Sequence, residues 1–172
     1  MLNIRIGEHS DVQRIREIME IVHDFLEDKA WYYIDGTTVT WLHNHIDEEG
    51  FTLVVENDDF EVVAFLVVRY PRSAPDNLGE YISDIFTETD AVAHMETVAV
   101  LPEYRGHQLQ VKLLEQAELM LDGGIKYSMC TVHPQNFASL GSFTKCKYKI
   151  IHDVDNKYKD LPRCVMMKEI RH

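Results

Sequence analysis

The stretch from Ala93 to Leu121 constrains the fold more than any other part of the chain, because its hydrophobic period changes once, across a proline. Residues 95–100 are dense in apolar and β-branched types, which favours a strand. Pro102 ends that strand, since it cannot donate a ladder hydrogen bond. The stretch therefore predicts a strand followed by a tight turn and then by an element of another kind.

That second element is a helix from Gln110. Its expected apolar face is Val111, Leu113, Leu114, Ala117, Leu119 and Leu121. We expect Gly123 and Gly124 to end it as C-cap residues. The turn before the helix is basic and contains a glycine, with Arg105, Gly106 and His107 in sequence. A helix N-terminus carries unpaired N–H groups and the positive end of the helix dipole, so this unit is suited to receive an anion such as a phosphate.

Two blocks of sequence make this interpretation more specific. The first is V-A-V-L-P-E-Y-R-G-H-Q-L-Q, from Val98 to Gln110. The second is P-Q-N-F-A-S-L-G-S-F-T-K-C-K-Y, from Pro134 to Tyr148. In these blocks the chain resembles the GCN5-related N-acetyltransferase (GNAT) superfamily, and the resemblance extends over essentially the whole chain. The first block looks like the acetyl-CoA pyrophosphate loop of that family, and the second is similar to its P-x-N-x-x-S segment.

The resemblance implies a fold and an activity. The expected fold is α/β: residues 1–172 form a single GNAT-like domain, a three-layer sandwich whose mixed, mostly antiparallel central sheet is flanked by helices. The implied activity is that of an N-acetyltransferase, which transfers the acetyl group of acetyl-CoA to a primary amine by direct attack in a ternary complex. The residues implied to bind the cofactor are Val98, Val100, Arg105, Gly106, His107, Gln108, Leu109, Gln110, Asn136, Ser139 and Phe143.

The chain departs from the family pattern at four positions. Gln108 and Gln110 occupy positions where the family has small residues, and Phe143 occupies the position of a proton-donating tyrosine. Lys147 replaces a glycine, so we expect the turn there to avoid a positive φ. These departures leave an alternative open, in which the chain is a catalytically weakened CoA-binding or interaction module. No general acid can be assigned.

The general base is expected on the central strand. Period-two alternation places His94, Glu96 and Val98 on one strand face. Members of the resembled family often carry Glu or His near this position, so we expect Glu96 to be the base, with His94, or a water held by either residue, as the second choice. A carboxylate partly withdrawn from water would have a raised pKa, which suits a base working near neutrality.

An aromatic cluster of Trp31, Tyr32 and Tyr33 lies in a loop between the first two expected helices. In the resembled family this region commonly lines the acceptor pocket, whereas the alternative is that the rings cover the core. Ser10 and Gln13 form a capping box for the first helix, and the second is expected to end at Gly50. His43 and His45 are two residues apart on the second helix, so we expect surface histidines there and no metal site.

Composition limits the partners and the location. A net charge of −12 argues against nucleic-acid binding and is compatible with a cationic acceptor, such as a small-molecule or peptide amine. The sequence has no apolar run long enough for a membrane span, and the three cysteines form no C-x-x-C pair. We therefore expect a cytoplasmic protein with reduced thiols, without a membrane or nucleic-acid partner. A homodimer through an exposed edge strand is compatible with the sequence.

Overall fold

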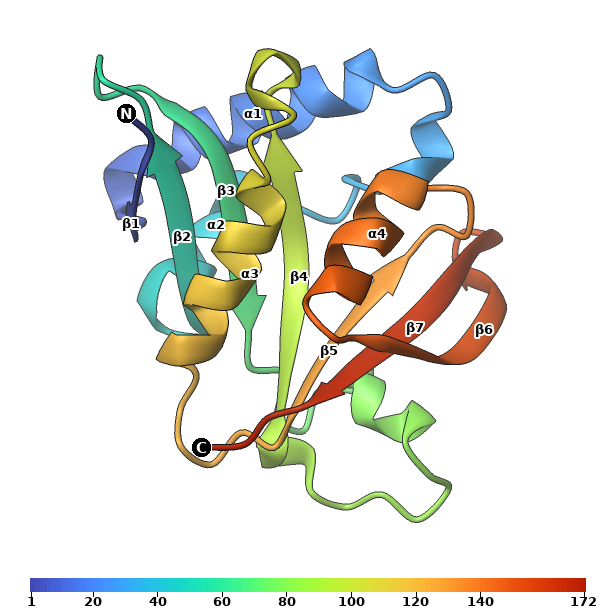
Figure 1. Ribbon diagram of the computed structural model, residues 1–172. Helices are drawn as coiled ribbons and strands as arrows, with labels where there is room; N and C mark the ends of the chain where they lie inside the picture. The colour runs from blue at the N-terminus through green and yellow to red at the C-terminus, as the bar shows by residue number, and fades with distance from the viewer.

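The computed structural model describes residues 1–172 and places all the strands in one mixed sheet, shown in Figure 1. The strands are β1 (Asn3–Ile6), β2 (Gly50–Glu56), β3 (Val62–Arg69), β4 (Val92–Val100), β5 (Tyr127–Val132), β6 (Lys149–Tyr158) and β7 (Leu161–Glu169). Their order in the sheet is β1-β2-β3-β4-β5-β7-β6. Every neighbouring pair is antiparallel except β4 and β5, which are parallel. The predicted mixed, mostly antiparallel sheet is confirmed.

Four α-helices cover the two faces of the sheet. They are α1 (Val12–Phe25), α2 (Val39–Asp47), α3 (Leu109–Met120) and α4 (Phe137–Lys145). In Figure 1, α3 and α4 lie in front of the sheet, and α1 and α2 lie behind it. This is the three-layer sandwich expected from the sequence. None of the helices combines the length and the hydropathy that crossing a lipid bilayer requires.

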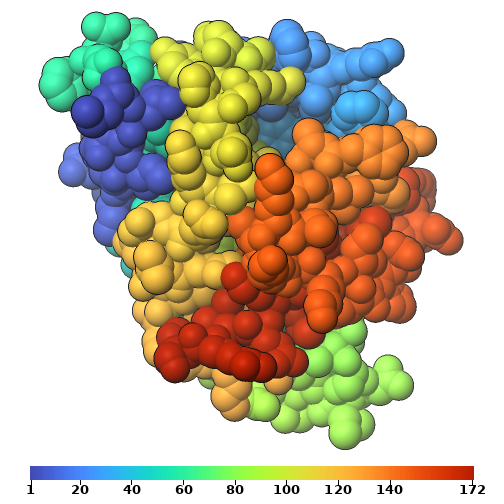
Figure 2. All heavy atoms as spheres, in the orientation of Figure 1, coloured from blue at the N-terminus to red at the C-terminus, as the bar shows by residue number.

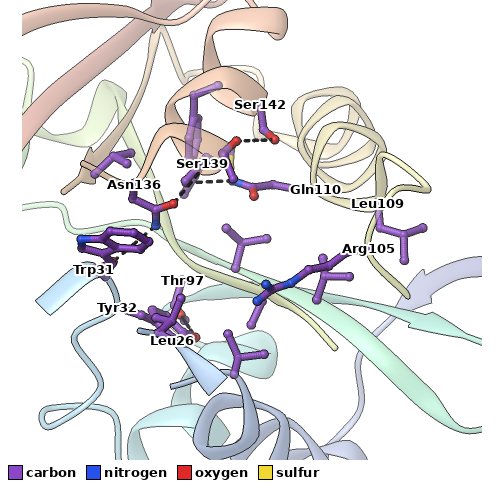
Figure 3. Close-up of a pocket in the computed structure, with 18 of the residues that line it drawn as sticks. Leu26, Trp31, Tyr32, Thr97, Arg105, Leu109, Gln110, Asn136, Ser139 and Ser142 are labelled. Carbon is purple, nitrogen blue, oxygen red and sulfur yellow. Dashed lines mark hydrogen bonds between the residues drawn. The ribbon is translucent and has the colours of Figure 1, made fainter. Parts of the chain in front are cut away.

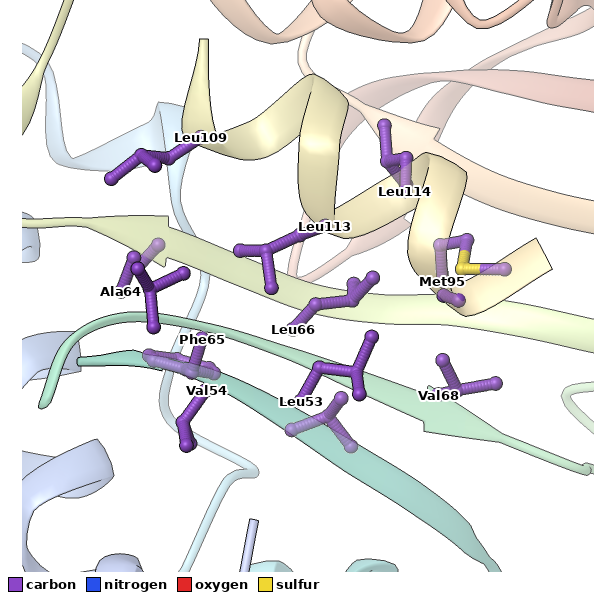
Figure 4. Close-up of a cluster of buried hydrophobic side chains, with 14 of the residues drawn as sticks. Leu53, Val54, Ala64, Phe65, Leu66, Val68, Met95, Leu109, Leu113 and Leu114 are labelled. Atoms are coloured by element: carbon purple, nitrogen blue, oxygen red, sulfur yellow. The ribbon is translucent and has the colours of Figure 1, made fainter. Parts of the chain in front are cut away.

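The core lies on both faces of β3. Seven of its eight residues are buried, as expected for a strand that is covered on both sides. Leu109, Leu113 and Leu114 of α3 are buried in the core, and Figure 4 shows Leu113 directed toward the sheet. Each is at most 3% exposed, so replacing one of them by alanine would cost about 2–5 kcal/mol of stability. This packing fixes the N-terminal end of α3 over the end of β4.

Helix α1 begins in a different way from the one predicted. The predicted capping box of Ser10 and Gln13 is wrong. The carboxylate of Asp11 instead accepts the backbone N–H of Glu8 at 2.8 Å, and the helix starts at the next residue, Val12. Asp11 is 7% exposed and belongs to the 3₁₀ turn His9–Asp11, so the cap lies one turn earlier than the sequence pattern suggested.

The predicted glycine C-cap of α3 is also wrong. The helix ends at Met120, and neither Gly123 nor Gly124 has a positive φ. The chain leaves the helix at Leu121, which is extended and 7% exposed, so burial of this side chain takes the place of a glycine cap. Leu119, expected on the apolar face, is 82% exposed.

Two predictions for α2 and its end require correction. Gly50 does not end the helix but begins β2, where a Cβ atom would lie 1.9 Å from the carbonyl oxygen of Val68. Glycine is therefore required by a close backbone approach. His45, expected at the surface, is fully buried: its ring stacks on Trp41 and its Nδ1 bonds to the Trp41 carbonyl at 2.7 Å. Burial lowers the pKa of His45.

The C-terminal part contains three residues in left-handed conformation that are not glycine. Lys147 has a φ of 73°, so the expectation that its turn would avoid a positive φ is wrong. The turn between β6 and β7 is confined to Lys159 and Asp160, with φ of 43° and 66°. The two strands therefore continue almost to the tip of this hairpin.

Candidate functional site

Strands β4 and β5 separate after a short seam. Only three residue pairs join them, from Val92 with Tyr127 to His94 with Met129. Beyond this seam β4 remains paired with β3 as far as Val100, while β5 remains paired with β7. Because buried backbone groups require partners, the open side of β4 is a place where a ligand can satisfy them.

Two residues of β4 direct their backbone groups to this open side. The N–H of Leu101 donates to the carbonyl of Val63 on β3 at 3.0 Å. Successive residues of a strand direct these groups to opposite sides, so those of Val98 and Val100 face away from β3. These are the two strand residues that the family resemblance implied.

A cavity of about 370 Å³ occupies the gap. Its walls come from the end of α1, the loop after it, β4, the N-terminus of α3, β5 and α4. Thirteen of the sixteen residues predicted for the site line it. They are Trp31, Tyr32, Glu96, Val98, Val100, Arg105, Gly106, Gln108, Leu109, Gln110, Asn136, Ser139 and Phe143. The other three, Tyr33, His94 and His107, do not.

The N-terminus of α3 closes one end of the cavity. Its N-cap residue, Gln108, is in left-handed conformation with φ 55°, and its side chain makes no capping bond. The first-turn N–H groups of α3 are therefore left without a side-chain cap and can serve an anion. Gly106 has a φ of 86°, a conformation that other residues rarely adopt, and no atom lies near the position that a Cβ would take. Glycine is therefore favoured here by the backbone conformation and not by a lack of space. Arg105 is exposed, with its guanidinium 4.8 Å from the centre of the Phe25 ring.

A hydrogen bond crosses from α3 to α4 at the cavity wall. The side-chain amide of Gln110 donates to the hydroxyl of Ser139 at 3.1 Å, as Figure 3 shows. Figure 2 shows these two helices side by side on one face of the molecule. The long side chain at this position thus joins two cavity walls instead of leaving the gap that a small residue would leave.

Helix α4 supplies polar and apolar parts of the wall. Asn136 caps the helix, because its Oδ1 accepts the N–H of Ser139 at 3.3 Å. Phe143 is 2% exposed and meets the ring of Tyr148 edge-on. The hydroxyl of Tyr148 bonds to Ser128 at 2.6 Å inside the core, so it does not replace the phenol that Phe143 lacks.

The aromatic cluster divides between two places. The hydroxyl of Tyr32 bonds to the hydroxyl of Thr97 on β4 at 2.7 Å, and Figure 3 shows the two side chains together. Burial raises the pKa of Tyr32, so its phenol is protonated at neutral pH. Trp31 also lines the cavity, whereas Tyr33 stacks on Tyr158 of β6 with ring centres 5.3 Å apart. Two of the three rings therefore line the cavity.

Glu96 lies at an irregularity of β4. Val67 pairs with Thr97 and Val68 with Met95, so Glu96 is the extra residue of a β-bulge. The alternation of side chains expected from His94 through Glu96 to Val98 is therefore interrupted at Glu96. Its side chain is one quarter exposed and its Oε2 lies 3.1 Å from Nδ1 of His94.

The electrostatic surroundings of Glu96 differ from those expected. Burial acts to raise the pKa of Glu96, but the hydrogen bond from His94 and the positive charge of Arg69, 3.8 Å away, outweigh it. The pKa of Glu96 is consequently lowered, and the expectation of a raised value is wrong. The sequence pattern predicted that Glu96 would be partly buried, but it did not reveal that Arg69 lies beside it.

A second, smaller cavity of about 20 Å³ lies on the other side of Glu96. It is lined by Asp76, Leu78, His94, Met95, Glu96, Cys130, Thr131 and Tyr158. Met95, Glu96 and Thr131 line both cavities, so the two spaces meet where β4 and β5 separate. The smaller space holds about one water molecule, so only a small group, such as the nitrogen of an amine, could enter it beside Glu96.

The sequence did not indicate four of the polar groups near this junction. Arg69 donates to both oxygens of Asp76, at 2.8 and 3.0 Å, and Thr131 bonds to the hydroxyl of Tyr158 at 3.3 Å. Arg69 is the one charged residue in the apolar strand β3, and this exception in the sequence could have identified it as a candidate site residue. Asp76 lies in an irregular loop, and no local pattern distinguishes it.

Comparisons with known proteins identify the family of the chain. The family model described as "Acetyltransferase (GNAT) family" matches residues 15–148, which is most of the chain. The chain therefore belongs to the GNAT acetyltransferase family. No curated protein sequence matches it significantly.

Solved structures of low sequence identity share the fold. An N-acetyltransferase from Staphylococcus aureus Mu50 has a TM-score of 0.74 at 17% identity, with 99% of each chain covered. The ribosomal-protein-S18-alanine N-acetyltransferase from Escherichia coli has a TM-score of 0.70 at 16% identity, covering 100% of this chain and 96% of that one. A phosphinothricin acetyltransferase from Sinorhizobium meliloti, in complex with AcCoA, has a TM-score of 0.71 at 14% identity, covering 98% and 88%.

Proposed function

We propose that the protein transfers the acetyl group of acetyl-CoA to a primary amine by direct attack in a ternary complex. The observation that carries this proposal is the open side of β4, with an uncapped helix N-terminus at one end and Glu96 at the other. Such an arrangement suits an extended ligand with amides along its length and phosphates at one end. Membership of the GNAT family and the AcCoA complex of a protein with the same fold support the choice.

The residues of the larger cavity fit acetyl-CoA. The first-turn N–H groups of α3, with Arg105 beside them, would hold the pyrophosphate. The backbone groups of Val98 and Val100, together with Asn136 and Ser139, would bind the pantetheine arm. Acetyl-CoA supplies the activated acyl group as a thioester. The protein's own task is to bind both reactants so that the acetyl carbon and the amine meet.

Glu96 is the group best placed to take a proton from the amine. It lines both cavities, so it faces the place where the two reactants would meet. Because its pKa is lowered, it is ionised throughout the neutral range and attracts an ammonium group. A lowered pKa also makes the carboxylate a weak base, so the proposed role depends on its position beside the amine or on a water molecule that it holds. Backbone N–H groups on the open side of β4 are available to stabilise an oxyanion.

The acceptor is proposed only as a class, a small-molecule or peptide amine. The smaller cavity is lined by the carboxylates of Asp76 and Glu96, and the positive charge of Arg69 balances only one of these two negative charges. Its surroundings therefore favour a cation. The cytoplasm is the proposed location, and the open edges β1 and β6 leave a homodimer as a proposal.

Binding of acetyl-CoA measured by calorimetry tests the cofactor site. We expect saturable binding by the wild type and about tenfold weaker binding by Arg105→Ala, because one charged phosphate contact is lost. His107→Ala is the matched control, since His107 is in the same loop and exposed but does not line the cavity. Absence of binding to the wild type would contradict the proposal.

A second candidate is a module that binds CoA without efficient turnover. Phe143 lacks the hydroxyl found in the resembled family, and the Gln110–Ser139 bond crosses the cavity wall. Turnover of acetyl-CoA with a panel of amines distinguishes the two. Saturable binding combined with no turnover of any amine would favour the module.

A further inference from the structure

A chain of two hydrogen bonds connects the loop before β4 to Glu96. The backbone N–H of Leu78 donates to Nε2 of His94 at 3.0 Å. Nδ1 of the same ring lies 3.1 Å from Oε2 of Glu96. His94 is 3% exposed, so bulk water has little access to the ring.

The direction of the first bond determines the protonation of the ring. A backbone N–H can only donate, so Nε2 of His94 must be the acceptor and carries no proton. The single ring proton of the neutral imidazole is then on Nδ1, where it is donated to Glu96. Both nitrogens of His94 are therefore engaged, and neither is available to a substrate.

The loop that supplies the N–H of Leu78 is held in place by its own contacts. The side-chain amide of Asn77 donates to the carbonyls of Arg72 and Thr89, at 2.7 and 3.1 Å. Leu78 itself is 4% exposed and packs in a small apolar cluster that includes Val92 of β4. The donor is thus fixed relative to the strand that carries His94.

Glu96 has a competing partner. Nη1 of Arg69 lies 3.8 Å from its other oxygen, too far for a hydrogen bond but near enough to attract it. Asp76, Tyr158 and Cys130 also line the smaller cavity, and none of them is hydrogen-bonded to Glu96. His94 is therefore the one residue that keeps the carboxylate away from a closed ion pair with the arginine.

We propose that His94 is a positioning residue that holds the Glu96 carboxylate toward the junction of the two cavities and links this placement to the loop at Leu78. The inference deepens the proposed function, because it rests on Glu96 being the base. Loss of the bond to Glu96 would let the carboxylate move to Arg69 and lower kcat. Loss of the bond to Leu78 would free the loop, which lines the acceptor side, and would raise KM for the amine.

Two amide substitutions separate the two bonds. In His94→Gln the amide reaches the position of Nε2, so an acceptor for Leu78 is kept and the donor to Glu96 is lost. In His94→Asn the amide reaches the position of Nδ1, so the donor to Glu96 is kept and the acceptor is lost. We expect His94→Gln to lower kcat about tenfold or more, in line with loss of a hydrogen bond to a charged group. We expect His94→Asn to raise KM for the amine with kcat within about threefold of the wild type.

Two measurements do not depend on turnover. The ¹⁵N shifts of His94 in the wild-type protein should show a protonated Nδ1 and an acceptor Nε2 at neutral pH. The amide of Leu78 should exchange its hydrogen about tenfold faster in His94→Asn than in the wild type, and at the wild-type rate in His94→Gln.

The outcomes distinguish this inference from the proposed function. A proton on Nε2, or the same kcat and KM in both variants, would overturn the role of His94 while leaving the transferase proposal intact. If no amine is acetylated at all, the ring shifts and the Leu78 exchange rates still decide whether the link between loop and carboxylate exists. The wild-type ring shifts also remain decisive if a variant fails to fold.

Discussion

Two arginines of the same sheet each lie beside two carboxylates, and the two groups differ in how completely they are paired. Arg5 of β1 donates to both oxygens of Asp11, at 2.7 and 2.8 Å, while its Nε donates to Glu56 at 2.7 Å. Both carboxylates are thus hydrogen-bonded to this guanidinium. Neither Asp11 nor Glu56 lines either of the two cavities.

The group around Arg69 is incompletely closed. This arginine makes a bidentate pair with Asp76 but remains 3.8 Å from Glu96, whose short contact is with His94 instead. Glu96 therefore keeps part of its hydrogen-bonding capacity for the cavities that it lines. The same residue types thus form a structural ion cluster at Arg5, where both carboxylates are hydrogen-bonded to the arginine. They form a candidate reactive site at Arg69, where the carboxylate of Glu96 is not.

Replacing the second carboxylate of each group should have the largest and most unequal effect. We expect Glu96→Gln to lower turnover about 10²–10⁴-fold, the range for loss of a general base, with acetyl-CoA affinity unchanged. Glu56→Gln is the matched control and should leave turnover per folded molecule unchanged. Steady-state kinetics with a saturating amine would measure both, and equal losses would remove the functional distinction between the groups.

Asp11→Asn should affect stability instead of activity. The Arg5 hydrogen bonds hold the pKa of Asp11 below its ordinary value of 3.8 although burial opposes this, so the wild-type carboxylate stabilises the fold above about pH 4. We expect the variant to be about 2 kcal/mol less stable at pH 7. The difference should shrink as the pH falls through the lowered pKa of Asp11, because the wild-type group then becomes protonated. Urea unfolding at several pH values would show this, and a difference independent of pH would contradict it.

Asp76→Asn should have the smallest effect on stability. The side chain of Asp76 is 58% exposed, and ion pairs that exposed contribute about 1 kcal/mol or less. We expect a loss below that of Asp11→Asn in the same urea experiment at pH 7. A loss as large as that of Asp11→Asn would mean that the Arg69 group is as structural as the Arg5 group.

Local patterns in the sequence predicted a central strand and helix, and the motifs of the family resemblance named most of the residues in the cavity wall. The change of period across Pro102 located β4 and α3. Asn136 and Ser139, named from the second block, line the cavity. Each of these signals depends on residues that are neighbours along the chain, so the sequence displays them directly.

The surroundings of Glu96 could not be predicted in that way. Its bulge arises from the pairing of β4 with β3, which no single segment reveals. The bond from Leu78 to His94 spans sixteen residues, and the approach of Arg69 depends on how the two strands are aligned. The direction of the Glu96 pKa shift was missed for this reason, since it is set by groups that meet only in the folded chain.

The short seam between β4 and β5 also divides the chain in sequence. Strands β1–β4 all precede Asp122 and strands β5–β7 all follow it, as the colours of Figure 1 show. Most strand contacts therefore form within one part or the other, and the larger cavity exists only once the two parts have docked. A ligand that fills it touches both parts and opposes their separation. The cavity would then determine how cooperatively the chain unfolds as well as what it binds.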